Sequence, residues 1–153
     1  CGYLGHEKKP CHCLPGTILK YRKRLSGPLL DRIDLHIDVP SVSEEKLTSN
    51  ILSESSQKVR ARVVKAREIQ KKRFKGLKIF NNGEMSSAQI KKFCQLSPEA
   101  LNLLKQAIDK LSLSARSYFK TIKISQTIAD LKGQKIIDVS YVAEALQFRS
   151  YDE

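Results

Sequence analysis

The feature that most constrains the fold is a series of helix start signals between residues 86 and 153. Ser97-Pro98-Glu99 combines an N-cap residue, a proline at the first helical position and an acid in the first turn. The N-cap candidates of the four helices are Ser86 or Ser87, Ser97, Ser114 and Asp138. Apolar residues recur at helical spacing after each of them. Four helices with short connections predict a small helical bundle over residues 86–153.

The first 40 residues predict a different arrangement. Helical spacing after Pro15 predicts one short helix, and Ser26 can cap a second. Residues 35–39 alternate between apolar and polar side chains, which predicts a strand that Pro40 ends. A single strand cannot form a sheet, so we expect its partners ahead of Cys1 and this chain to be part of a longer protein. The predicted fold is therefore mainly α, with one orphan strand.

Positive charge is concentrated in one segment. The chain has 28 Lys and Arg against 16 Asp and Glu, and ten of these bases lie in residues 58–78 beside a single acid, Glu68. An acidic, Ser-rich linker (residues 41–53) precedes a predicted helix over residues 54–74, in which Val59, Val63, Ala66 and Phe74 form a narrow apolar stripe. A localised basic stripe favours contact with a polyanion, although many such charge runs are only solvated helix faces. The candidate nucleic-acid contacts are Lys58, Arg62, Lys65, Lys72 and Arg73.

Composition excludes two other classes of protein. Apolar residues make up 41% of the chain, which is enough for a packed core and argues against wholesale disorder. No window approaches the roughly 20 consecutive apolar residues of a transmembrane helix. We therefore expect no membrane association.

Three of the four cysteines fall within the first 13 residues, at Cys1, Cys11 and Cys13. Closely spaced thiolates with glycines between them suit tetrahedral zinc. The fourth ligand would be His6, His12 or a Cys ahead of the chain, and the alternative is a reduced loop that holds no metal. Cys94 lies in an apolar helical pattern instead.

The sequence lacks a complete active site of its own. It contains no G-x-x-x-x-G-K-[ST] phosphate loop and no apolar run ending in paired acids. Its three histidines form no pattern with Ser or Cys that suggests a nucleophile triad.

Several segments nevertheless resemble a known family. Residues 22–36 (RKRLSGPLLDRIDLH) are similar to the signature of the magnesium-chelatase-like AAA+ ATPases, specifically the ComM competence family. Residues 113–118 (LSARSY), 127–131 (TIADL) and 142–149 (VAEALQFR) match the C-terminal pattern of that family. Residues 1–6 (CGYLGH) and the C-x-C at residues 11–13 match its cysteine insertion.

The resemblance implies a domain organisation. Residues 1–40 would be the end of the AAA+ α/β core, 41–85 the linker and basic helix, and 86–153 the helical lid. The phosphate loop and the Walker B acids, which bind most of the ATP and Mg²⁺, would lie ahead of Cys1. One Cys of the family's zinc-binding set would also lie ahead of Cys1. This chain would then keep Cys1, Cys11 and Cys13, which make an incomplete zinc site. The chain alone would be inactive as an ATP hydrolase.

The resemblance also gives two arginines a role. Arg32 is similar to the arginine finger that reaches the nucleotide of a neighbouring subunit, and the alternative is a local ion pair with Asp31 or Asp34. Arg116 resembles the sensor-2 arginine, which contacts the γ-phosphate in its own subunit, and the alternative is ordinary surface exposure. An arginine finger, the role that Arg32 resembles, raises the rate of hydrolysis by about 10³–10⁵-fold, because the transferred phosphoryl group needs a positioned cation.

The sequence patterns and the family resemblance leave three candidate functions. The first is a ring-forming, hexameric, cytoplasmic ATPase that acts on DNA, as a helicase-type branch-migration motor in natural transformation. The second is a chelatase-like ATPase that remodels a protein partner. The third is a stand-alone basic helical module that binds DNA, which the orphan strand and the cysteines disfavour.

Overall fold

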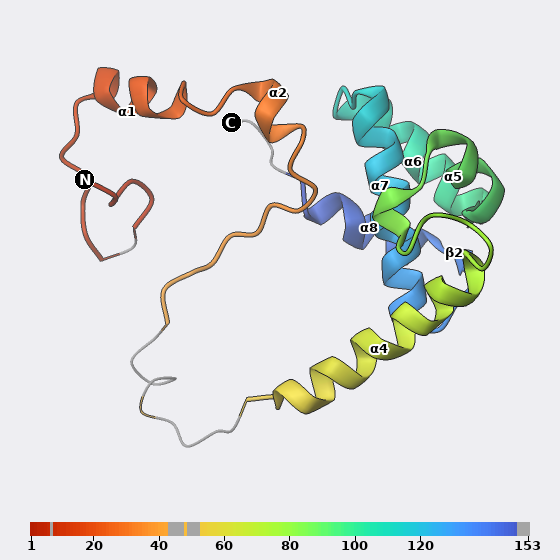
Figure 1. Cartoon of the computed structure of the whole chain (residues 1–153). Helices are drawn as coiled ribbons and strands as arrows, with labels where there is room; N and C mark the ends of the chain where they lie inside the picture. The colour runs from red at the N-terminus through yellow and green to blue at the C-terminus, as the bar shows by residue number, and fades with distance from the viewer. Residues whose placement is uncertain (7, 43–47, 49–52, 150–153) are drawn as a thin grey trace. The chain divides into compact units, whose positions relative to one another are not determined.

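The computed structural model describes residues 1–6, 8–42, 48 and 53–149. The chain divides into two compact units, residues 1–33 and 34–153 (Figure 1). Most of the predicted linker at residues 41–53 lies outside the described residues. Among the described helices, none is both long and apolar enough to cross a membrane.

The first unit contains two short helices, α1 (Pro15–Arg22) and α2 (Gly27–Leu30). Each begins with a proline in its first turn, where the missing N–H costs no hydrogen bond. Both predicted helices are confirmed, although the second ends at Leu30. Neither helix buries a residue, so local backbone preferences rather than core packing define them.

In the second unit, α4 (Ser56–Arg73) confirms the predicted long basic helix. The Ser55 side chain caps it by accepting the Lys58 N–H, and the chain turns away after Phe74 through Gly76, whose φ of +83° suits glycine. Only the second half of the apolar stripe is buried. Ala66 and Phe74 are 4% and 3% exposed, whereas Val59 and Val63 are 40% and 47% exposed.

The four predicted helices of the bundle are confirmed. They are α5 (Ser87–Phe93), α6 (Pro98–Lys110), α7 (Ala115–Leu131) and α8 (Val139–Gln147). Ser86, Ser97 and Ser114 accept backbone N–H groups as N-caps, and Ser86 forms a full capping box with Gln89. Helix α7 is central, because α4, α5 and α8 all pack against it. The mainly α fold predicted from the sequence is therefore confirmed.

A small parallel sheet, which the sequence did not predict, joins the segment after α5 to the segment before α8. Strands β1 (Gln95–Leu96) and β2 (Ile136–Ile137) pair in register, and the Ser97 N–H extends the ladder to the Ile137 carbonyl at 3.0 Å. A short 3₁₀ helix, η1 (Asn82–Glu84), also contacts α7. Strands of two residues are too short to produce an alternating pattern, so sequence periodicity could not reveal them.

The structure differs from the sequence prediction at residues 35–39, which form no strand. A strand needs a hydrogen-bonded neighbour, and none of the described residues forms a ladder with this segment. The His36 N–H instead donates to the Phe148 carbonyl at 2.8 Å, beyond the end of α8.

The core lies between α4, α5, α6, α7 and α8. Phe74 packs edge-on against Phe93, with ring centroids 5.6 Å apart, and Leu104, Ile137 and Val142 are fully buried. Cys94 belongs to this core, and its burial raises the pKa of its thiol to about 11. The Cys94 thiol is therefore neutral and serves as a packing group.

Candidate functional site

The structure brings the three N-terminal cysteines together. The sulfur atoms of Cys1, Cys11 and Cys13 all lie within 4.8 Å of one another, and those of Cys1 and Cys11 are 3.5 Å apart. Tetrahedral zinc with bonds of about 2.3 Å places its sulfur ligands about 3.8 Å apart. Three soft thiol donors at this spacing fit a zinc ion.

The two histidines suggested as a fourth ligand are not part of this cluster in the described residues. The His6 Nδ1 instead accepts the backbone N–H groups of Lys8 and Lys9, at 3.1 and 3.2 Å. The His6 ring also packs edge-on against Tyr3, and Gly5, with a φ of +78°, makes the turn between them. His6 thus shapes the loop, and the described residues supply three ligands.

Arg32 follows α2 and is exposed to solvent. Its Nη1 lies 3.5 Å from the carbonyl of Pro28, which is a weak contact at the outer limit of a hydrogen bond. Asp34, one of its suggested ion-pair partners, instead pairs with Lys120 at 3.0 Å. Among the described residues, neither Asp31 nor Asp34 forms an ion pair with Arg32, so its exposed guanidinium is available to an external anion.

Arg116 lies in the first turn of α7 and is also exposed. Ser114 and Ser117 form the cap beside it, because the Ser114 hydroxyl accepts the Ser117 N–H at 3.1 Å. The first turn of a helix carries unpaired N–H groups and a positive dipole end, which disfavour a cation there. An anionic ligand bound at this helix end would offset that penalty.

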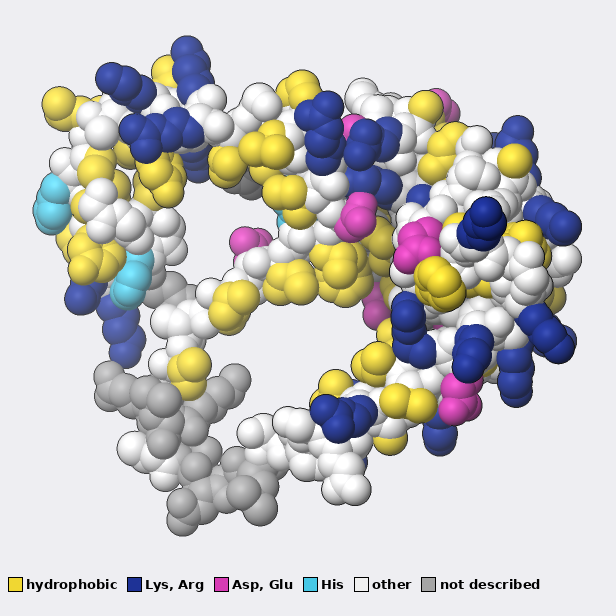
Figure 2. All heavy atoms as spheres, in the orientation of Figure 1, with side chains coloured by type: hydrophobic (Ala, Val, Ile, Leu, Met, Phe, Trp, Pro, Cys, Tyr) yellow, Lys and Arg dark blue, Asp and Glu magenta, His cyan; other side chains and the backbone are white. Residues whose placement is uncertain are grey.

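The exposed bases of α4 form two flanks, separated by its packing face. Lys58, Lys65 and Lys72 recur every seven residues and share one flank, which we term the lysine flank. Arg60, Arg67 and Lys71 lie on the other. Figure 2 shows Lys and Arg side chains gathered over this helix and its neighbours. Arg62 is exposed as well, but it pairs with Glu54 at 2.7 Å.

Arg73 has a different role from the one predicted. Its side chain is only 12% exposed and donates to both carboxylate oxygens of Asp130 and, at 2.8 Å, to the Asn82 side chain. A guanidinium held in this way cannot also bind a phosphate. The internal ion pair with Asp130 therefore rules out Arg73 as a nucleic-acid contact.

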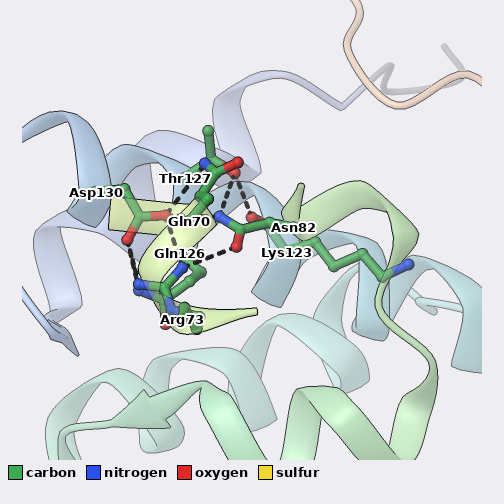
Figure 3. Close-up of polar contacts among 7 residues, drawn as sticks. All are labelled: Gln70, Arg73, Asn82, Lys123, Gln126, Thr127 and Asp130. Carbon is green, nitrogen blue, oxygen red and sulfur yellow. Dashed lines mark hydrogen bonds and ion pairs between the residues drawn. The ribbon is translucent and has the colours of Figure 1, made fainter. Parts of the chain in front are cut away.

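Asp130 is the centre of a buried polar network that joins α4, η1 and α7 (Figure 3). Besides Arg73, it accepts hydrogen bonds from the side chains of Gln70, Asn82 and Gln126, at 3.2, 2.8 and 3.2 Å. Asn82 also donates to Thr127 at 3.0 Å. The network fixes the basic helix and the turn after it on α7, the helix that carries Arg116.

Comparison with known proteins gives two family matches. The model described as "Magnesium chelatase, subunit ChlI C-terminal" matches residues 53–149, and "Magnesium chelatase, subunit ChlI" matches residues 1–47. The two matches meet at the predicted linker.

Two relatives are similar over nearly the whole chain. "Competence protein ComM" of Haemophilus influenzae is 40% identical over 137 residues, which cover 89% of this chain and 26% of the relative. "Uncharacterized protein YifB" of Escherichia coli is 37% identical over 151 residues, which cover 98% of this chain and 28% of the relative. The chain thus spans about a quarter of the length of these curated relatives.

Proposed function

Because the chain belongs to the magnesium chelatase subunit ChlI family, we propose that it works as the C-terminal part of a ring-forming AAA+ ATPase that acts on DNA. The relatives are several times longer than this chain, and its own sequence has no phosphate loop. The proposal therefore assigns most of the ATP and Mg²⁺ contacts to the remainder of such a protein. The ring would be a homo-oligomer, with six subunits as the expected number.

The exposure of Arg32 and Arg116 is the observation that carries the ATPase part of the proposal. Arg73 shows what a structural arginine looks like in this fold, since a buried carboxylate occupies its guanidinium. Arg32 and Arg116 are held by no such partner in the described residues. In this proposal Arg32 approaches the nucleotide of the neighbouring subunit, and Arg116 approaches the γ-phosphate in its own subunit. A guanidinium suits both tasks because it stays protonated and offers a planar set of donors.

The lysine flank of α4 supports the DNA part of the proposal. Lys58, Lys65 and Lys72 are exposed on one side of a helix that the buried network holds in place. Regularly spaced cations on a fixed helix match the repeating charge of a phosphate backbone. The relative from Haemophilus influenzae is named a competence protein, and this name is in keeping with the proposed DNA substrate.

Removing the lysine flank should weaken DNA binding and flatten its salt dependence. Each phosphate that a cation neutralises contributes about 0.9 to the slope of log K against log salt concentration. The triple variant Lys58→Ala, Lys65→Ala, Lys72→Ala should therefore lower that slope by roughly 3. Fluorescence anisotropy with labelled DNA over a series of salt concentrations measures it.

The matched control removes three exposed lysines elsewhere, with Lys105→Ala, Lys110→Ala and Lys132→Ala. This control lowers the net charge by the same amount as the lysine-flank variant, but it should leave the slope of log K against log salt concentration mostly unchanged. Equal effects from the two triple variants would show that only net charge matters. A wild-type chain that does not bind at low salt would refute the DNA substrate and favour a chelatase-like ATPase that remodels a protein.

We also propose that Cys1, Cys11 and Cys13 supply three ligands of a structural zinc site, with the fourth ligand from outside this chain. The full-length protein should then contain one zinc ion per subunit. The variant Cys11→Ala, Cys13→Ala should lose it, because Cys1 and the fourth ligand alone cannot complete the tetrahedral set, while Cys94→Ala should keep it. Elemental analysis of the purified proteins measures this, and equal zinc contents in the two variants would refute the site.

A further inference from the structure

The turn after α4 exposes an aromatic ring that the core does not use. Phe80 is 70% exposed, whereas Phe74, six residues earlier, is 3% exposed and packs against Phe93. Leu77, in the same turn, is 41% exposed. A single exposed apolar side chain needs no explanation by itself. The way in which this turn is held, and the charges around it, set Phe80 apart.

Hydrogen bonds fix the backbone on which Phe80 sits. The Glu84 carboxylate accepts the Phe80 N–H at 2.7 Å and also accepts the side-chain amide of Asn81. The next residue, Asn82, is buried in the Asp130 network, as Figure 3 shows. A turn that is anchored in this way presents its side chain at little further cost in conformational entropy.

The segment around Phe80 carries more bases than acids. Lys75 and Lys78 are exposed in the same turn. Lys123 extends from α7 away from the polar network, and its ammonium group donates to the Gly83 carbonyl at 2.7 Å (Figure 3). Glu84, the acid of this turn, keeps its negative charge, but its oxygens are occupied by the hydrogen bonds described above. The turn therefore combines an exposed aromatic ring on a fixed backbone with several cations.

We propose that Phe80, with the exposed Lys75 and Lys78 that precede it and with Lys123, which contacts the same turn at Gly83, is a stacking site for an unpaired base of single-stranded DNA. Proteins that hold single strands combine aromatic side chains, on which bases stack, with cations that contact the phosphates. In a duplex the faces of the bases are covered by their neighbours, so the ring could not reach them. The inference rests on the proposed DNA function and narrows it to a substrate with single-stranded regions.

The test compares the single-strand and duplex affinities of the whole chain. The probes are a labelled oligothymidylate of roughly 20 nucleotides, longer than the site size of one binding module, and a duplex of equal length. Phe80→Ala should weaken single-strand binding by roughly fivefold to 100-fold and leave duplex binding nearly unchanged. Phe80→Trp should retain the affinity, and Phe80→Leu should not, because leucine keeps the apolar surface but cannot stack. Leu77→Ala is the matched control from the same turn.

Each outcome separates the stacking site from the proposed function. A Phe80→Ala chain that binds single strands like wild type would overturn the stacking site, while salt-dependent DNA binding would still stand. The stacking site would also be overturned if Phe80→Ala weakened single-strand and duplex binding equally, or if Phe80→Leu bound single strands with wild-type affinity. If the substitution changed only self-association in sedimentation, Phe80 would be a protein contact instead. No binding of either probe by wild type would overturn the DNA function itself.

Discussion

Replacing Arg73 by alanine is expected to destabilise the helical unit by about 3–5 kcal/mol, because it leaves the buried Asp130 carboxylate without its cation. The side chain of Asp130 is 0% exposed, so water cannot replace the lost guanidinium without opening the packing of α4 on α7. The amides of Gln70, Asn82 and Gln126 would remain as donors, but they carry no charge. Since domains of this size are stable by only about 5–15 kcal/mol, such a loss should be visible in urea denaturation followed by circular dichroism.

Two further variants make this prediction specific. Arg62→Ala removes an arginine from the same helix, but its ion pair with Glu54 is exposed, with side chains 60% and 43% accessible. It should cost less than about 1 kcal/mol. Arg73→Met combined with Asp130→Asn removes both buried charges but keeps a side-chain oxygen that can accept from the neighbouring amides, and it should recover much of the loss. If Arg73→Ala were no less stable than Arg62→Ala, the network would not be what fixes α4.

The helices were predictable because their signals are local. Ser86, Ser97 and Ser114 cap the helices that their side chains predicted, since an N-cap satisfies N–H groups within three residues of itself. The cysteine cluster was predictable for the same reason, because short spacing with glycine turns keeps Cys1, Cys11 and Cys13 close. Local chemistry of this kind does not depend on the rest of the fold.

The Asp130 network was not predicted, because its partners are far apart in the sequence. Arg73 and Asp130 are 57 residues apart, and a basic residue within a basic run gives no sign that it faces inward. The available signal was the periodicity. Gln70 and Arg73 continue the buried stripe of Ala66 and Phe74, and polar residues on the apolar face of a helix indicate a buried hydrogen-bond network.

Replacing Arg32 by alanine in the full-length protein is expected to lower the rate of ATP hydrolysis by about 10³–10⁵ and to leave nucleotide affinity nearly unchanged. A finger that acts on the neighbouring subunit contributes mainly when charge develops on the transferred phosphoryl group, so the loss falls on turnover. Arg32→Lys should recover little, because an ammonium group keeps the charge but lacks the planar pair of donors. Steady-state hydrolysis and equilibrium binding of a fluorescent nucleotide measure the two quantities. Hydrolysis by Arg32→Ala at the wild-type rate would show that this arginine takes no part in the reaction.

If the full-length protein forms the proposed ring, mixing two variants decides whether Arg32 acts between subunits. One parent would carry Arg32→Ala and keep its nucleotide site, and the other would keep Arg32 but carry a disabled phosphate loop. Each parent alone should be inactive. In a mixed ring, however, an intact nucleotide site can face an intact Arg32 across the interface, so hydrolysis should reappear and peak near equal proportions. An arginine that served its own subunit would give no recovery at any ratio, because no subunit would then hold both functional parts.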